Sequence, residues 1–358
     1  MSRGSKPDDS CLRIDEWPEA DRAAWRAAQQ PRDPLEPKVG YASRWKPTTQ
    51  KLIEAGYGSW LAWLAQAGHL KQSSAIASRT TSAHVRAYLD MLEASGLAPY
   101  TIALRMQNLG NALRAIAPDQ EWERVLRASG RIHCRAAPTR DRAAILQPAE
   151  DVLMLGHDMM HAAEHDRFGT DRDRATLFRD GLIITVLVHR PLRSRNFHSL
   201  RIGKELHRRA ETWFLAIDKS ETKSGNYFAT FWPVALAQAM EHYISVHRPA
   251  LLASSRKNLP PTDILWISNH GTPMTASAIA FQVKSRTEAQ FGKPINPHSF
   301  RHLAATTIAT ADPEGVMDIQ GVLGHASPAA GEKYYNKAKM VDAGRRYQQT
   351  LDSWGDEP

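Results

Sequence analysis

Cysteine is almost absent from the sequence. Only Cys11 and Cys134 occur among 358 residues, far apart and without a partner cluster. Two such residues provide neither a disulfide framework nor a cysteine-based zinc site. The chain therefore suits a reducing cytoplasm.

Long apolar runs are also missing. The longest of note, GLIITVLV at 181–188, is far shorter than the roughly 20 residues that a membrane-spanning helix needs. Residues 1–23 are polar and acidic where a secretory signal carries an apolar stretch. We expect a soluble, cytoplasmic protein without a membrane partner.

Acidic and basic residues are both common in the sequence, and the basic residues are in excess. Lys and Arg number 46 against 38 Asp and Glu, a net charge of +8 at pH 7. This excess favours a polyanionic partner such as nucleic acid, although many basic proteins bind none. Hydrophobic residues at 42% and charged residues at 23% are ordinary for globular proteins, and the length suffices for two domains.

The pattern changes near residue 40. Residues 1–40 are rich in Pro, Asp, Glu and Arg, and three prolines in QQPRDPLEPKVG forbid a continuous helix. We expect an N-terminal arm or disordered tail there. Residues 41–130 have helical periodicity. In one stretch, apolar residues follow Val85 at i+3, i+4 and i+7, with Ser82 as the expected N-cap and Gly96 as the expected end of the helix. This segment is predicted to be a helical bundle.

A second domain follows a basic stretch that two prolines interrupt. Residues 131–148 suit an interdomain linker, and residues 149–358 form the second domain with a C-terminal tail. The fold class predicted is mainly α with a small antiparallel β-sheet (α+β), and the last two strands are expected to form a hairpin. Helices are expected at 149–165, 174–189, 234–247 and mostly from 275 onward, and strands at 200–206, 212–218 and 226–232.

The segment 295–335 concentrates polar chemistry. His298 and Arg301 are three positions apart and share a face if the segment is helical, as Pro297 in a first turn allows. A cationic pair at a helix start suits a phosphate oxygen. Downstream, LGH at 323–325 is followed nine positions later by Tyr334, a side-chain type that can be a covalent nucleophile if neighbouring cations lower its pKa from about 10.

Two further segments supply such cations. HRPLRSRNFHSLRIGK at 189–204 contains five basic residues and no acidic one, and ETKSG at 221–225 places Lys223 on the predicted hairpin turn. Each segment alone also fits a solvated surface loop. The basic residues of the first segment are Arg190, Arg193, Arg195, Arg201 and Lys204.

Taken in order, PLRSRNFHSLR, TKSG between two strands, NPHSFRHLAAT and VLGHASPAAGEKYY resemble the tyrosine recombinase family, also called phage integrases. The resemblance runs from near residue 48 to about 345, with its specific motifs in the second domain. It implies a helical core DNA-binding domain followed by a catalytic domain. The implied activity is site-specific DNA cleavage and rejoining through a 3′-phosphotyrosine intermediate.

The resemblance also assigns roles to six residues. Arg193 and Arg301 would hold the nonbridging oxygens of the scissile phosphate, and Lys223 would protonate the departing 5′ oxygen. His298 would handle a proton or position the phosphate, and His325 would donate a hydrogen bond to the phosphate. Tyr334 would be the nucleophile that attacks the phosphorus. No cofactor and no metal are implied, and the sequence has no phosphate-binding loop motif.

Departures from the family pattern leave alternatives open. Pro191 and Asn196 stand where relatives often have Gly and Glu, so Arg190 or Arg195 is the fallback for the first arginine. Minor rivals are Tyr335 for the nucleophile and Lys219 for the hairpin lysine. Separately, HDMMHAAEH at 157–165 repeats histidine every four residues, a spacing that can bind zinc or nickel, but it lacks the H-E-x-x-H pattern.

Double-stranded recombination sites are the implied partner, bound by a homo-tetramer across two sites, and the source is expected to be a bacterial mobile element. Accessory proteins are unknown. The alternatives are a catalytically impaired DNA-binding relative, a type IB topoisomerase-like enzyme and a metal-dependent hydrolase. Candidate phosphate contacts are Arg105, Arg114, Arg124, Arg127 and Arg131 in the first domain and Arg190, Arg195, Arg201 and Lys204 in the second.

Overall fold

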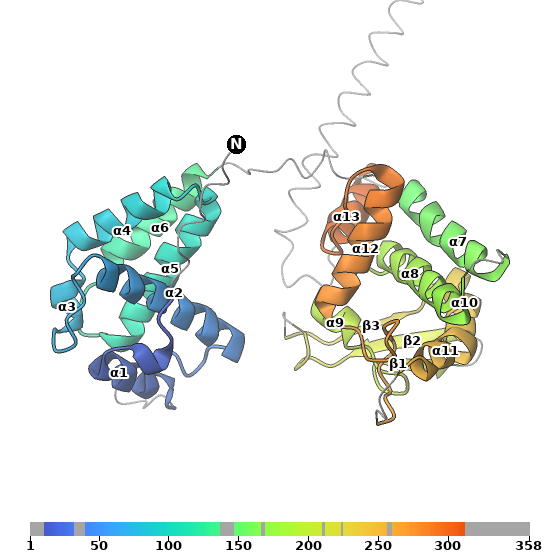
Figure 1. The fold of residues 1–358 in the computed structure, drawn as a ribbon, viewed down its shortest axis with the longest axis horizontal. Coiled ribbons are helices and arrows are strands. Elements are labelled where there is room, and N and C mark those ends of the chain that lie inside the picture. Colours follow the sequence, from blue (N-terminus) through green and yellow to red (C-terminus); the bar gives the residue numbers. More distant parts are fainter. Residues whose placement is uncertain are drawn as a thin grey trace, which may run out of the picture. The chain divides into compact units, whose positions relative to one another are not determined.

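A computed structural model describes residues 11–31, 40–136, 147–165, 169–209, 212–222, 225–255 and 260–311. The chain divides into two compact units, 1–140 and 141–358 (Figure 1). Each unit has its own hydrophobic core. Within the described residues, no helix combines the length and apolar character that crossing a bilayer requires.

The first unit is helical throughout its described residues. Proline at the first turn starts two of its long helices, and the Thr81 side chain caps a third by accepting a hydrogen bond from the backbone N–H of His84 at 3.2 Å. That cap is one residue earlier than the expected Ser82. The helices are η1 (Ile14–Glu16), α1 (Glu19–Gln29), α2 (Pro47–Gln66), α3 (Ile76–Arg79), α4 (Ser82–Ala94), α5 (Pro99–Ile116) and α6 (Glu123–Arg135).

The prediction of a tail is wrong for residues 11–31. Trp17 and Trp25 are buried in the core of the first unit, and the Trp17 ring contacts Tyr57 at 5.0 Å edge to face. Asp21 is buried as well, because it accepts a hydrogen bond from Tyr57 at 2.7 Å and pairs with Arg79. Burial of the two indoles and pairing of the Asp21 carboxylate stabilise this segment in the folded unit, although its polar composition had indicated disorder. The rest of residues 1–40, apart from Gly40, lies outside the described residues.

The predicted linker is also shorter than expected at its start. Helix α6 continues through Arg135, five residues into the 131–148 stretch. Residues 137–146 lie outside the description, and α7 begins at Ala149 as expected.

The second unit is mostly helical with a small three-stranded antiparallel sheet, which confirms the predicted fold class (Figure 1). Its helices are α7 (Ala149–His165), α8 (Asp171–His189), α9 (Ser194–His198), η3 (Val234–Leu236), α10 (Ala237–His242), the π turn η4 (Tyr243–His247), α11 (Arg248–Ala253), α12 (Ala276–Phe291) and α13 (Ser299–Ala311). Its strands are β1 (Leu206–Arg209), β2 (Thr212–Ile217) and β3 (Phe228–Phe231).

The hairpin prediction holds for β2 and β3, which pair antiparallel from Phe214 opposite Phe231 to Ile217 opposite Phe228. The predicted strand 200–206 is wrong, because the chain turns at Gly203. That residue has φ +82° and donates its N–H to the Leu206 carbonyl at 2.8 Å. A left-handed glycine closes a tight turn here, so the strand starts only at Leu206.

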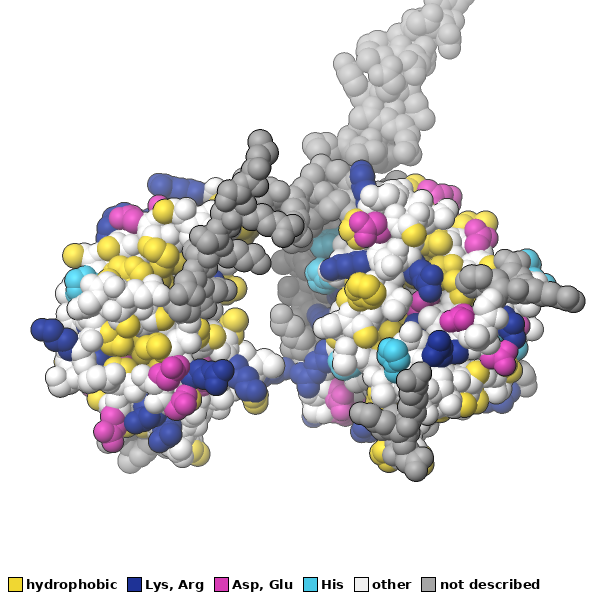
Figure 2. Space-filling view, in the orientation of Figure 1, with side chains coloured by type: hydrophobic (Ala, Val, Ile, Leu, Met, Phe, Trp, Pro, Cys, Tyr) yellow, Lys and Arg dark blue, Asp and Glu magenta, His cyan; other side chains and the backbone are white. Residues whose placement is uncertain are grey.

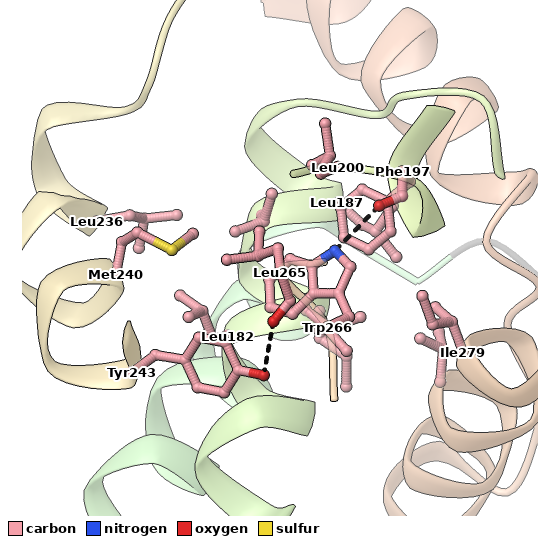
Figure 3. Close-up of a cluster of buried hydrophobic side chains, with 14 of the residues drawn as sticks. Leu182, Leu187, Phe197, Leu200, Leu236, Met240, Tyr243, Leu265, Trp266 and Ile279 are labelled. Carbon is pink, nitrogen blue, oxygen red and sulfur yellow. Dashed lines mark hydrogen bonds between the residues drawn. The ribbon is translucent and has the colours of Figure 1, made fainter. Parts of the chain in front are cut away.

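The core of the second unit fixes α9, the short helix that follows Arg193. Trp266 is fully buried, stacks on Phe197 with ring centroids 5.2 Å apart, and donates its indole N–H to the Phe197 carbonyl at 3.0 Å (Figure 3). A buried indole with a satisfied N–H holds its partner in one place. Helix α9 is therefore anchored from inside the unit.

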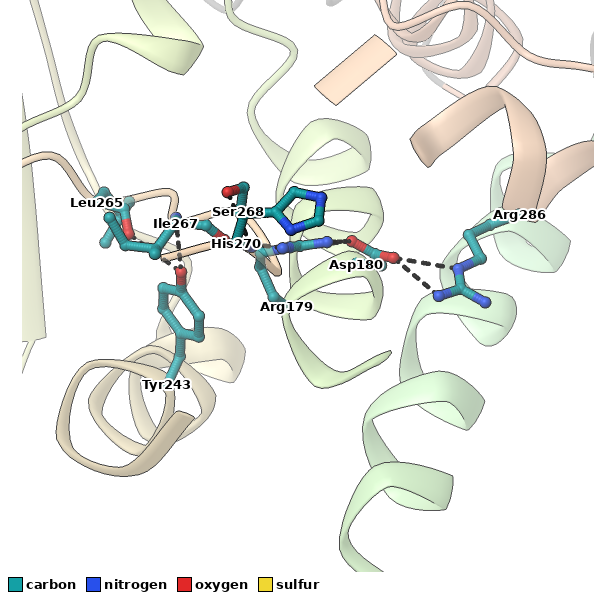
Figure 4. Close-up of polar contacts among 8 residues, drawn as sticks. All are labelled: Arg179, Asp180, Tyr243, Leu265, Ile267, Ser268, His270 and Arg286. Atoms are coloured by element: carbon teal, nitrogen blue, oxygen red, sulfur yellow. Dashed lines mark hydrogen bonds and ion pairs between the residues drawn. The ribbon is translucent and has the colours of Figure 1, made fainter. Parts of the chain in front are cut away.

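A buried ion network ties α8 to α12 (Figure 4). Asp180 accepts hydrogen bonds from Arg179 at 2.5 and 3.0 Å and from Arg286 at 3.0 and 3.1 Å. Arg179 also donates to the Ile267 carbonyl at 2.8 Å. Removing one member would leave a buried charge without its partner, so this network acts as a structural clamp.

Candidate active site

Arg301 is the most buried of the three family-matched residues that the structure describes, which are Arg193, His298 and Arg301. It lies in the first turn of α13, is 7% exposed, and donates from Nη1 to the Pro191 carbonyl at 2.7 Å, a contact spanning 110 sequence positions. Phe300 and Leu303 on either side of it are buried in the core. The second family arginine is thus joined to the loop that carries the first.

Arg193 lies at the other end of that short loop, directly before α9. Its side chain is half-buried, and its carbonyl accepts the N–H of Phe197 at 2.9 Å. The preceding Leu192 is buried and donates its N–H to the Arg190 carbonyl at 2.7 Å. Buried apolar residues therefore flank Arg193 on both sides and hold its backbone close to Pro191.

Arg190, a fallback for the first arginine, is occupied by the fold. Its guanidinium donates to the Phe231 carbonyl at 3.2 and 3.3 Å and to the His189 carbonyl at 2.9 Å. Burial lowers the pKa of Arg190. This side chain joins the end of α8 to β3, whereas the other fallback, Arg195, is exposed on α9.

His298 is exposed immediately before α13 rather than within it. Its backbone N–H donates to Asn296 Oδ1 at 3.0 Å, and its carbonyl accepts the N–H of Arg301 at 3.3 Å. The His298 ring meets the His302 ring edge-on at 5.4 Å. His298 and Arg301 are therefore presented from the same turn at the start of α13.

Lys223 itself falls outside the described residues, but the loop around it is described on both sides. The buried Thr222 hydroxyl lies 2.8 Å from the Asn226 carbonyl and 3.1 Å from the Lys219 carbonyl. Asp218 accepts the N–H and hydroxyl of Ser220 at 2.9 and 2.7 Å, and these hydrogen bonds lower its pKa. Local hydrogen bonds thus order the hairpin loop up to the lysine, and the rival Lys219 is exposed.

The proposed nucleophile and the last phosphate ligand cannot be compared with the structure. His325, Tyr334 and the rival Tyr335 lie outside the described residues. Among the described part of the chain, the structure brings the Arg301 side chain and the Arg193 loop together and presents His298 beside Arg301.

Two buried tyrosines, Tyr243 in the second unit and Tyr57 in the first, are unsuited to nucleophilic attack. Burial raises the pKa of Tyr243 to about 12, and its hydroxyl donates to the Leu265 carbonyl at 3.1 Å (Figure 3). Burial likewise raises the pKa of Tyr57 well above its ordinary value. Both phenols stay protonated and engaged within the protein.

The basic residues proposed to contact DNA in the first unit lie on α5 and α6, and several have protein partners. Glu123 pairs with Arg114 at 2.7 Å and lies 3.7 Å from Arg127. Arg124 donates to the Thr80 carbonyl at 2.8 Å. Arg105 is half-buried and Arg131 is exposed. All five remain predictions as DNA contacts.

In the second unit, the sequence prediction missed the acidic residue that follows the basic stretch. Glu205 accepts two hydrogen bonds from the Arg201 guanidinium, at 2.6 and 3.0 Å, and lies 3.9 Å from Lys204. Burial opposes ionisation of Glu205, but the paired arginine outweighs it, and the net effect lowers the pKa of Glu205. The contact of Arg201 with Glu205 therefore stabilises the turn before β1.

Basic side chains do not gather into one block on the visible face of either unit (Figure 2). On the face that Figure 2 draws, Lys and Arg are interspersed with Asp, Glu and apolar side chains. Such mixing is compatible with phosphate contacts at separate points along each unit.

The fold of this chain resembles those of solved recombinase structures. The solved structures similar in fold include the XerH site-specific recombinase bound to its difH substrate in a pre-cleavage complex, with a TM-score of 0.54, 16% identity, and 83% of this chain and 78% of that chain covered. The post-cleavage complex of XerH with palindromic difH gives a TM-score of 0.57 at 16% identity, covering 84% and 79%. No curated protein matches by sequence.

At 16% identity these structures show a shared fold and nothing finer. The family assignment comes from the sequence itself, because the model of the phage integrase family matches residues 157–340, more than half of the chain. The chain belongs to the phage integrase family.

Proposed function

We propose that this protein is a site-specific DNA recombinase that cleaves and rejoins DNA strands by transesterification through a 3′-phosphotyrosine intermediate. Family membership supports this proposal. The observation that carries it is the hydrogen bond from Arg301 to the Pro191 carbonyl at 2.7 Å, because it ties the second family arginine, across 110 sequence positions, to the loop that leads into Arg193.

The first chemical step exchanges one phosphoester for another. The Tyr334 phenolic oxygen attacks the phosphorus, the new O–P bond forms, and the bond to the 5′ oxygen breaks. His298 takes the phenolic proton, and Lys223 gives a proton to the departing 5′ oxygen. A 5′ hydroxyl of another strand then attacks the same phosphorus and releases the tyrosine, so the number of phosphoester bonds is unchanged and no external energy is needed.

Arg193 and Arg301 stabilise the negative charge that grows on the nonbridging oxygens during both steps. Guanidinium groups that the fold holds in place before the reaction would need little reorganisation at the transition state. His325 adds a hydrogen bond to the same phosphate. The burial of Arg301 strengthens this effect because water screens its charge less.

The proposed partner is double-stranded DNA with two recombination sites, bridged by four copies of the protein. The XerH recombinase, which is similar in fold, is bound to its own difH DNA substrate in both solved complexes. We extend DNA binding to this chain on the basis of family membership and the net charge of +8.

A covalent-adduct experiment tests the function. The full chain is incubated with a library of nicked duplexes that carry a randomised central region, and adducts that survive denaturation are isolated and sequenced. The nick lets the short 5′ fragment diffuse away, so the phosphotyrosine accumulates. Wild type is compared with Tyr334→Phe and, as the matched control, Tyr335→Phe.

The proposal predicts an adduct with wild type and Tyr335→Phe, none with Tyr334→Phe, and enrichment of one sequence among the adducts. Binding without any adduct would indicate an impaired DNA-binding relative. Adducts without sequence enrichment, together with relaxation of supercoiled DNA, would indicate a type IB topoisomerase-like activity.

A further inference from the structure

Glu164, near the C-terminal end of α7, meets two histidines from a later part of the chain. Its Oε1 lies 2.6 Å from Nε2 of His247, and its Oε2 lies 3.1 Å from Nε2 of His242. One potential ligand atom from each of the three residues falls within 4.8 Å of the other two. Glu164 belongs to the HDMMHAAEH stretch, but both of its partners are distant in sequence.

The π turn η4 is what places both histidines on one side. The backbone N–H of Arg248 donates to the Tyr243 carbonyl, five residues earlier. In a regular α-helix, residues five apart point about 140° away from each other. The wider π turn brings His242 and His247 back into register, and their rings meet edge to face at 4.9 Å. Such bulges occur often at functional sites.

The three side chains form a partly buried cluster that solvent can still reach. Phe178 on α8 stacks on the His247 ring at 4.2 Å, and burial is the main cause that lowers the pKa of His247. The Glu164 and His242 side chains are 35% and 38% exposed, against 8% for His247. Nε2 of His242 is itself buried and has no hydrogen bond of good geometry among the described residues.

We propose that Glu164, His242 and His247 bind one divalent cation of the zinc class and thereby cross-link α7 to the helix that contains the π turn. Two imidazoles and a carboxylate are a donor set that zinc accepts at 2.0 to 2.2 Å, which requires ligand atoms about 3.3 Å apart. The carboxylate contacts of 2.6 and 3.1 Å are already close to that spacing.

None of the three ligands is among the six residues assigned to strand cleavage, and the role that we propose for the cation is structural. A cation that binds the folded chain but not the unfolded chain stabilises the fold in proportion to its occupancy. Among the described residues, no other ion pair connects the segments that these three ligands join.

The test uses the full chain without an affinity tag, stripped by a chelator and dialysed. Isothermal titration with Zn²⁺ measures affinity and stoichiometry, and Co²⁺ absorption reports a tetrahedral site of nitrogen and oxygen ligands. We expect one ion per chain. His242→Gln and Glu164→Gln should each weaken binding by at least about 100-fold, because losing a direct ligand exceeds the 10- to 100-fold cost of losing its supporting partner.

The matched control is the double variant His161→Gln/His165→Gln. These two rings stack at 4.1 Å on the exposed face of α7 and form the rival pair for a surface-bound ion. The control should keep full affinity, and Zn²⁺ should raise the melting temperature of wild type and the control but not of His242→Gln. Absence of stoichiometric binding, unchanged binding by His242→Gln, or its loss in the double variant would each overturn the proposal.

Discussion

At the scale of single residues, the arginines of the second unit make different contacts, although Arg190, Arg193 and Arg201 lie close together in sequence. Arg301 is buried and holds the Pro191 carbonyl, Arg190 holds β3, and Arg201 is forked onto Glu205. Arg193 lies at the start of α9 beside the loop that Arg301 holds. The sequence alone does not distinguish the roles of these arginines, whereas their hydrogen-bond partners in the structure do.

Replacing Arg301 tests the role of its planar fork. Arg301→Lys keeps the charge but not the two-sided geometry, and we expect cleavage to fall about 100- to 1000-fold, the range for losing one transition-state donor. The rate of adduct formation measures this. Arg208→Ala, which removes an exposed partner of Glu241, is the control and should cleave like wild type; equal rates for all three proteins would contradict the assignment.

The Arg201–Glu205 pair predicts a pH dependence of stability. The pKa of Glu205 is lowered in the folded chain, so the pair stabilises fully above the ordinary pKa of about 4.3, and this contribution is lost as the pH falls through the lower folded value. Urea unfolding of wild type and Glu205→Gln should differ most near pH 7 and converge below about pH 4. A constant difference across that range would show that the charge of Glu205 is irrelevant.

At the scale of elements, α1 belongs to the folded first unit. Trp25→Ala removes a fully buried indole and should destabilise that unit by about 3 to 5 kcal/mol. Leu52→Ala on the same unit is the control, since Leu52 is 48% exposed, and should cost less than about 0.5 kcal/mol. Urea unfolding of the full chain measures both. Equal effects would mean that the segment from residue 11 to 31 is dispensable.

Local periodicity predicted the helices best. The expected 149–165 helix coincides with α7, and the expected hairpin coincides with β2 and β3. The strand at 200–206 failed because a single left-handed glycine decides the turn. The contacts of Arg301 with Pro191 and of Glu164 with His247 join distant segments, and no local pattern encodes which distant residues meet.

At the scale of the whole molecule, the net charge of +8 is the property that DNA binding would use. Binding that releases counterions from phosphates weakens steeply with salt, with a slope of about −0.9 per phosphate contacted in a plot of log affinity against log salt. We expect such a linear decrease for duplex DNA. Arg131→Ala, at an exposed candidate contact, should reduce the slope by about one unit without changing sequence preference. An affinity independent of salt would argue against phosphate contacts altogether.

The central claim is that Arg193 and Arg301 act on the same phosphate, and a double-mutant cycle tests it most directly. Adduct formation is timed for wild type, Arg193→Ala, Arg301→Ala and the double variant on one nicked duplex, after circular dichroism has confirmed that all four are folded. Groups that stabilise one transition state as a unit are strongly non-additive, so the double variant should be only slightly slower than either single variant. Losses that multiply as if the arginines were independent would contradict the account.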